Sequence, residues 1–177
     1  GGILTDSASV LVVVDQWTRD GAGEVGAGGT TVDVRLQANE PQWMVAEARP
    51  ARWENYGIEL SRVARQLLEN DQVALPLAAA GDIRSGAVDD SVLRALTQLA
   101  EVYRLDVSVL RSGHPLRVFG TDRISNHTEG RAVDIWAIDG RPVIELGATA
   151  VVTDFMRAAS DVGAYQVGGP ADLVLSD

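Results

Sequence analysis

The spacing of the apolar residues changes once along this chain, near residue 57, and this change limits the folds open to it. Before that point, segments 8–17, 30–38 and 42–49 are rich in Val and Thr, and 31–36 alternates polar and apolar side chains. A period of two is typical of strands that bury one face. Short polar or Gly-rich segments separate the three, so we expect an antiparallel meander.

After residue 57 the apolar residues recur at helical spacing. Two helices are predicted from such stripes, with Asp90 or Ser91 as the N-cap of the second. The first stripe consists of Leu60, Val63, Ala64, Leu67 and Leu68, and the second of Val92, Leu93, Leu96, Leu99, Ala100 and Tyr103. A third helix is predicted over 151–159, ending at Gly163. Residues 71–89 between the first two helices are mostly small and show no period.

Three further strands are predicted in the second half of the chain, over 105–111, 131–137 and 141–145. Asp139-Gly140 predicts a hairpin turn between the last two, and 164–167 can form one more strand. We therefore expect an α+β protein. Its parts are a β-rich N-terminal module over 1–52, a helical linker region over 53–89, and a main domain over 90–177.

Composition excludes several classes of function. The net charge of −10, without clustered basic residues, argues against nucleic acid as a partner. No apolar run approaches the length of a transmembrane helix, and the absence of cysteine excludes thiolate metal sites and Cys nucleophiles. Gly21–Gly26 fits the GxGxxG pattern, but a strand rather than a helix follows it, so a hairpin loop is the better interpretation.

Both histidines of the chain fall in a long loop predicted over 112–129, before the strand that carries Asp134. Gly130 allows a sharp entry into that strand, and Ala132 shares a strand face with Asp134. An imidazole and a carboxylate brought together in this way are good zinc ligands. A buried, hydrogen-bonded His127 or a surface His–Asp pair would produce the same pattern.

The segment Ser125-Asn-His127-Thr-Glu-Gly130-Arg-Ala132-Val-Asp134 resembles the SxHxxGxAxD signature of a zinc peptidase superfamily. That superfamily includes D-alanyl-D-alanine carboxypeptidases, lysostaphin-type endopeptidases and hedgehog signalling domains. Upstream, 111–115 is similar to the SGYR element of the carboxypeptidases, with His114 at the Tyr position and Pro115 at the Arg position. The resemblance covers about residues 90–170.

The resemblance implies a hedgehog/DD-peptidase-like domain, with an antiparallel sheet and flanking helices, preceded here by the small β-rich module. It implies that zinc is held by His127, Asp134 and a further histidine near the C-terminal end of the domain, with a Glu or His as general base. It also implies a peptidoglycan peptide as partner and an extracytoplasmic location at the cell envelope, although the given chain shows no signal peptide.

No histidine follows His127, so the implied metal shell lacks its last ligand and the domain lacks its C-terminal strand. The chain can be a fragment, it can be a degenerate member that keeps the fold for binding, or His114 can supply the third ligand. With two ligands, zinc is expected to bind weakly. The function predicted is a zinc metallopeptidase-like domain, truncated or degenerate and inactive as given; the alternative is a non-catalytic binding or interaction module of the cell envelope.

Candidates for the catalytic residue are Glu129 and His114, although a solvated carboxylate and an ordinary loop histidine are the alternative interpretations. Four arginines near the signature can receive a substrate carboxylate: Arg111, Arg117, Arg123 and Arg131. Trp136 shares the face of Asp134 and is expected either to line a substrate groove or to pack in the core.

Overall fold

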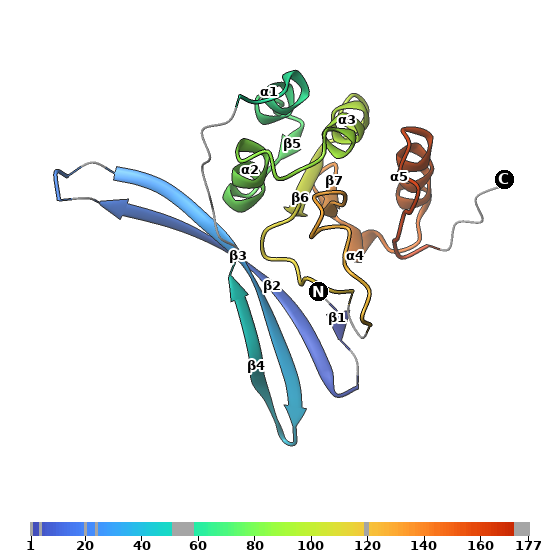
Figure 1. Ribbon diagram of the computed structural model, residues 1–177. Helices are drawn as coiled ribbons and strands as arrows, with labels where there is room; N and C mark the ends of the chain where they lie inside the picture. Colours follow the sequence, from blue (N-terminus) through green and yellow to red (C-terminus); the bar gives the residue numbers. More distant parts are fainter. Residues whose placement is uncertain are drawn as a thin grey trace.

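The computed structural model describes residues 2–3, 5–19, 21–23, 25–50, 59–118 and 121–171. Within these residues the chain forms two four-stranded sheets, of order β1-β2-β3-β4 and β5-β6-β7-β8, together with helices. Helices α1, α2 and α3 lie side by side, α5 lies next to α3, and the long strands β2 and β3 pass below α2 in the view of Figure 1. The α+β class predicted from the sequence is confirmed.

The first sheet is an antiparallel meander, as predicted, with strands longer than the sequence pattern indicated. It consists of β1 (Gly2–Ile3), β2 (Ser7–Arg19), β3 (Val25–Asn39) and β4 (Gln42–Pro50). Leu11 pairs with Asp33, and Val10 pairs with Val34. Because side chains alternate along a strand, these two pairs lie on opposite faces of the sheet. None of the four strands pairs with the second sheet, as expected.

The second sheet consists of β5 (Val73–Ala74), β6 (Leu105–Val109), β7 (Asp134–Ile138) and β8 (Arg141–Pro142). Strand β5 is parallel to β6, and the remaining pairs are antiparallel. The predicted hairpin turn is present, since Asp139 and Gly140 both have positive φ angles, 51° and 73°.

Two predictions for the end of the chain were wrong. The strand predicted over 141–145 stops at Pro142, and α4 (Val143–Leu146) follows it. A proline directly before a helix restricts the backbone without removing a needed donor, and Gly147, at φ 57°, ends the helix. No strand forms over 164–167, a segment that lies within the described residues.

The remaining helices are α1 (Arg62–Leu68), α2 (Leu77–Arg84), α3 (Asp90–Leu99) and α5 (Ala150–Asp161). The helix predicted before Gly163 is thus present, and α3 is capped by Asp89 rather than by Asp90 or Ser91, because the Asp89 carboxylate accepts from the Ser91 amide at 2.8 Å. None of the helices among the described residues is long and apolar enough to cross a membrane.

Helix α2 was not predicted, because residues 71–89 show no stripe of large apolar residues. Its sequence, Leu-Ala-Ala-Ala-Gly-Asp-Ile-Arg, is nonetheless buried over 78–83. Small side chains let a helix approach its neighbours closely on several sides, so the helix needs no large apolar stripe. Helix α2 contacts both β3 and β6, and therefore lies between the two sheets.

The described part of 53–89 belongs to the main core. Residues of α1, β5 and α2 pack in one hydrophobic cluster with residues of α3, β6, β7 and α5. The segment 53–89 was predicted to be a helical linker region. Residues 59–89 of it pack in the core of the main domain, which begins near Leu60. Residues 51–58 lie outside the described residues. The largest fully buried side chains of this cluster are Leu67, Ile83, Leu93, Leu96, Leu105, Leu110, Ile138 and Val152.

Candidate metal centre

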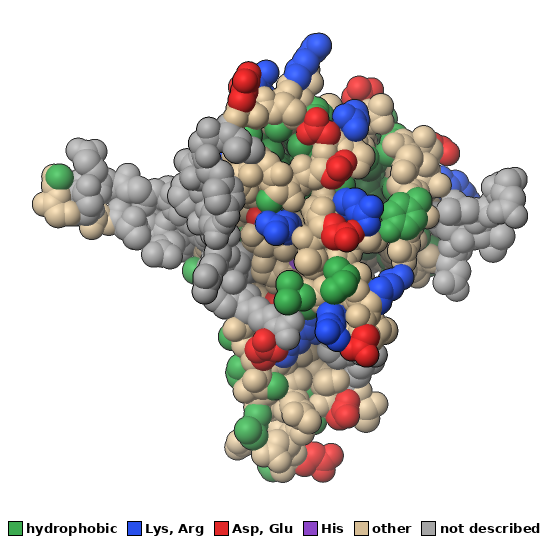
Figure 2. Space-filling model, viewed as in Figure 1, with side chains coloured by type: hydrophobic (Ala, Val, Ile, Leu, Met, Phe, Trp, Pro, Cys, Tyr) green, Lys and Arg blue, Asp and Glu red, His purple; other side chains and the backbone are tan. Residues whose placement is uncertain are grey.

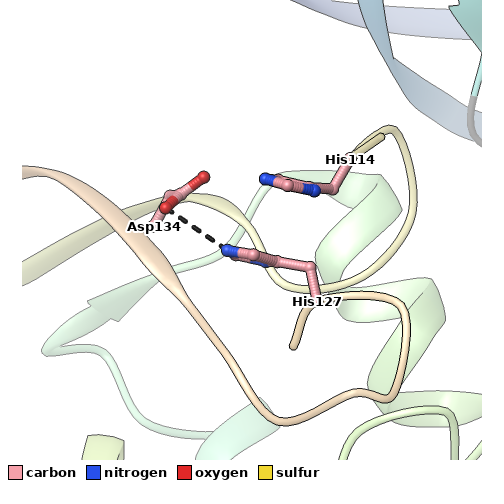
Figure 3. A group of neighbouring side chains, drawn as sticks. All are labelled: His114, His127 and Asp134. Atoms are coloured by element: carbon pink, nitrogen blue, oxygen red, sulfur yellow. Dashed lines mark ion pairs between the residues drawn. The ribbon is translucent and has the colours of Figure 1, made fainter. Parts of the chain in front are cut away.

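His127 is buried and its ring is held in one orientation. The ring nitrogen Nδ1 lies 2.5 Å from the Leu110 carbonyl oxygen. Because a carbonyl only accepts, Nδ1 carries a proton and donates it, so Nε2 has a free lone pair when the ring is neutral and a second N–H when the ring is protonated. That nitrogen lies 3.4 Å from Oδ1 of Asp134 (Figure 3). The prediction that the two side chains approach one another is confirmed.

Gly130 is required by the backbone around it. Its φ is +68°, and a Cβ added there would stand 2.1 Å from the carbonyl oxygen of Ala87. The Asp89 amide donates to the Gly130 carbonyl at 2.9 Å, so the loop is fixed against the connection between α2 and α3. Only glycine fits such a contact at positive φ. The position three residues after His127 is therefore glycine for a packing reason.

Ser125 and Asp134 are placed by local hydrogen bonds. The buried Ser125 hydroxyl accepts from the His127 amide at 3.3 Å, in a tight turn before the histidine. Asp134 is the first residue of β7 and pairs with Val109 of β6, and its carbonyl accepts from the Ser108 hydroxyl at 3.2 Å. The signature residues thus bring a loop imidazole to the start of a strand.

His114 completes a group of three. Its ring stacks on that of His127, with centroids 4.0 Å apart and an angle of 8° between the planes. Its Nδ1 lies 2.9 Å from the Pro115 carbonyl oxygen, which leaves Nε2 on the side of the ring toward Asp134 (Figure 3). Each residue offers one ligand atom, and these atoms all lie within 4.8 Å of one another. This group can hold a metal ion.

Asp82 of α2 anchors the segment that precedes His114, a role that was not predicted from the sequence. The carboxylate is buried and accepts from the amides of Arg111 and Ser112, at 2.9 and 2.7 Å, and from the Ser112 hydroxyl. An acidic residue within an Ala-rich helix was the one available signal, since a charge is seldom buried without such partners.

The three side chains shift one another's protonation. Burial lowers the pKa of His127, but the hydrogen bond and charge of Asp134 and the Leu110 carbonyl outweigh it, so the pKa is raised overall. The pKa of His114 is lowered, first by burial and then by the positive charge of His127. Burial raises the pKa of Asp134, yet the hydrogen bond and charge of His127 leave it lowered. A neutral imidazole beside a carboxylate is the state that binds a cation.

Asp33 connects the first sheet to this centre. Its side chain is 0% exposed and accepts from the Ser9 hydroxyl and from Nε of Arg35, both at 2.8 Å. The negative charge of Asp33 raises the pKa of His114, against the larger effect of burial. The sequence pattern did not reveal this residue, because a charged position in an alternating strand is expected to face solvent.

Other residues singled out in the sequence lie outside the group of three. Glu129 pairs with Arg131 at the surface, where the Glu129 side chain is 51% exposed. Arg117 pairs with Asp122, and Nε of Arg111 donates to the Thr128 carbonyl at 3.2 Å. Basic and acidic side chains are interspersed over the face seen in Figure 2, where little histidine surface is visible.

No family model matches the chain, and comparisons with curated proteins and with solved structures found no match. The case for a function therefore depends on the geometry of His114, His127 and Asp134, together with the resemblance carried by residues 125–134.

Proposed function

We propose that this chain is a zinc-dependent hydrolase of peptide bonds, with His114, His127 and Asp134 as the three protein ligands of the metal. The observation that carries the proposal is the convergence of their ligand atoms within 4.8 Å. Catalytic zinc sites use three protein ligands and leave one position to water or substrate, whereas structural sites use four. The number of ligands therefore favours a catalytic centre.

The donor set supports zinc. Two imidazole nitrogens and one carboxylate oxygen are common zinc ligands, although the same set also serves non-haem iron. The bond from Nδ1 of His127 to the Leu110 carbonyl is the kind of outer contact that orients a metal-binding histidine. Bound zinc would lower the pKa of a coordinated water toward neutrality and polarise the scissile carbonyl.

His114 changes the expectation of weak zinc binding, which assumed two ligands. With a third ligand from the same loop, the number of protein ligands equals that of known catalytic sites. The proposal therefore takes up the third of the alternatives left open by the sequence. It needs no histidine from a later strand.

The finer parts of the proposal rest on the resemblance of residues 125–134. By that resemblance the main domain has the hedgehog/DD-peptidase-like fold, the substrate is a peptide of the cell wall, and the protein works at the cell envelope. The mixed sheet β5-β6-β7-β8, with His127 before β7 and Asp134 at its start, is compatible with this proposal.

The test is metal content and hydrolysis measured on the same samples. After dialysis against zinc, elemental analysis should give about one zinc per chain, and His114→Ala and His127→Ala should each lose most of it, because two ligands remain. Parallel loading with ferrous iron separates the two metals. Turnover of a D-Ala-D-Ala-terminated peptide should follow the zinc content.

Glu129→Gln is the matched control, because Glu129 lies in the same loop but outside the group of three. It should retain zinc. Stoichiometric zinc without hydrolysis of any peptide would favour the non-catalytic binding module. Full zinc retention by His114→Ala would refute the ligand assignment.

A further inference from the structure

A cavity of about 350 Å³ adjoins the metal centre and is shared by the two sheets. Asp134, one of the three proposed ligands, forms part of its wall. Leu11 of β2 contributes from the first sheet, and Trp136 of β7 and Val143 and Ile144 of α4 contribute from the second unit. Its volume falls within the range of about 300–1,000 Å³ typical of small-ligand pockets.

The described residues that line this cavity are apolar apart from Ser108 and Asp134. Ser108 already donates to the backbone of Asp134. Among the described residues, none of the side chains that line the cavity is basic, and the Asp134 carboxylate would repel an acidic group. The chemistry of the wall therefore fits an uncharged, apolar group.

Two large apolar side chains of this wall are exposed. Trp136 is 52% exposed and Ile144 is 91% exposed. Exposed apolar groups gathered at a concave site are typical of a binding surface. Trp136, which the sequence left open between groove and core, is thus on the wall of a cavity rather than in the core.

Leu11 enters the wall because of the register of the first sheet. It lies directly opposite Asp33, on the face of β2 and β3 that is turned toward the second unit. Its neighbours Val10 and Val12 point to the other face and are 42% and 40% exposed. The face of the sheet that carries Asp33 therefore also supplies Leu11 to the cavity.

We infer that this cavity binds an uncharged, apolar side chain of the peptide substrate, beside the bond presented to the metal, with Leu11 as the wall supplied by the first sheet. The inference rests on the proposed function and narrows its substrate class. It also gives the N-terminal sheet a role in specificity.

The first experiment compares metal-binding probes that differ only in side chain. N-acetyl-leucine hydroxamate and N-acetyl-glycine hydroxamate both chelate zinc, and calorimetry on the zinc-loaded protein measures their affinities. Burial of a leucine side chain should make the leucine probe about tenfold to a hundredfold tighter. The corresponding aspartate probe should gain nothing over glycine. Equal affinities for the leucine and glycine probes would overturn the inference.

Variants on the two faces of β2 test the wall. Leu11→Trp fills the cavity and should reduce the leucine probe to the affinity of the glycine probe, with zinc content unchanged. Val10→Trp adds the same side chain to the opposite face and should leave both affinities unchanged. An equal effect of the two variants would refute the assignment of Leu11.

A second pair of variants covers the case in which Leu11→Trp fails to fold. Ile144→Asp places a charge on an exposed wall residue, and it should weaken the leucine probe about tenfold while the glycine probe is unaffected. Val102→Asp is the matched control, because Val102 is 75% exposed and does not line the cavity.

A metal-independent measurement separates failure of the cavity from failure of the proposed function. N-acetyl-leucinamide has no chelating group, so its binding to the zinc-free protein reports on the cavity alone. Titration should shift the methyl resonances of Leu11, Val143 and Ile144. Shifts without zinc binding would refute the metal centre and keep the cavity, whereas zinc binding and hydrolysis without shifts would refute the cavity.

Discussion

The two halves of this molecule bury their residues in different ways. The second unit, residues 59–171 where described, encloses a cluster of Leu, Ala and Val side chains from helices and a sheet. The first sheet leaves Val10, Val12 and Val14 partly exposed on one face, while its other face carries Asp33, whose side chain is fully buried. A sheet that buries charge on its covered face depends on what covers it. The first sheet is thus best understood as one wall of the site.

The largest loss of stability is expected at Gly130, where the second unit has no space for a larger side chain. Gly130→Ala should lower the free energy of unfolding by roughly 3–5 kcal/mol, because the new Cβ meets the Ala87 carbonyl at a positive φ angle. Gly140→Ala is the control: its φ is similar, at +73°, but nothing lies within 4 Å of the added Cβ. It should cost about 1–2 kcal/mol. Equal losses in chemical denaturation would show that the close contact is absent.

Asp82→Ala should have the second-largest effect, with a loss of about 2–4 kcal/mol, because two part-buried amides and one hydroxyl lose their buried acceptor. The same variant should weaken zinc binding, since the segment before His114 is no longer anchored. Asp154→Ala serves as control, because its carboxylate pairs only with Arg157 at the surface, and should change stability by less than about 0.5 kcal/mol. An unchanged zinc affinity in Asp82→Ala would show that the hydrogen bonds of Asp82 do not position His114 for metal binding.

Asp33→Asn tests whether the first sheet acts on the site. An amide lacks the negative charge that strengthens the hydrogen bonds from Ser9 and Arg35, so we expect a loss of about 1–3 kcal/mol. The pKa of His114 should fall further below its ordinary value, because a negative charge that raises it has been removed. Proton NMR of the imidazole resonances measures this shift. A pKa of His114 that does not move would mean that the two halves are electrostatically independent.

The smallest effect concerns the protonation of the zinc-free centre. His127 should titrate above the ordinary pKa of about 6.5 for histidine and His114 below it. Asp134→Asn should lower the pKa of His127, because the hydrogen bond and charge that raise it are lost while burial remains. The chain has two histidines, so His114→Ala assigns the resonances directly. The reverse order of the two pKa values would refute the geometry of the pair.

Local patterns predicted most of the elements. Alternation predicted the meander of the first sheet, and helical stripes predicted α1, α3 and α5, because each of these elements buries one face against the rest of the chain. Helix α2 was not predicted, because its small residues are buried over most of the helix and form no apolar stripe. The end of β8 at Pro142 was not predicted, because the helix that follows is too short to show a helical period in the sequence.

The site was predicted in part. Residues 125–134 predicted the approach of His127 and Asp134, because their spacing is short and the turn between them is local. His114 was left as one of three alternatives, since twelve residues of irregular loop separate it from His127 and no pattern determines how such a loop folds. Asp33 and Asp82 lie still further away in sequence, and only tertiary packing brings them near the loop.

The anchoring of the loop has a consequence for the thermodynamics of metal binding. The amide of Ser125 donates to the Leu116 carbonyl at 3.0 Å, and that of Arg131 donates to the Asn126 carbonyl at 2.8 Å, so the backbone is closed at several points. Closing a free loop around an ion costs conformational entropy that grows with loop length. Here the loop is already ordered in the folded chain, so binding of an ion does not lose this entropy and the affinity is correspondingly higher. Such preorganisation favours binding of the ion by the folded chain without local refolding of the loop.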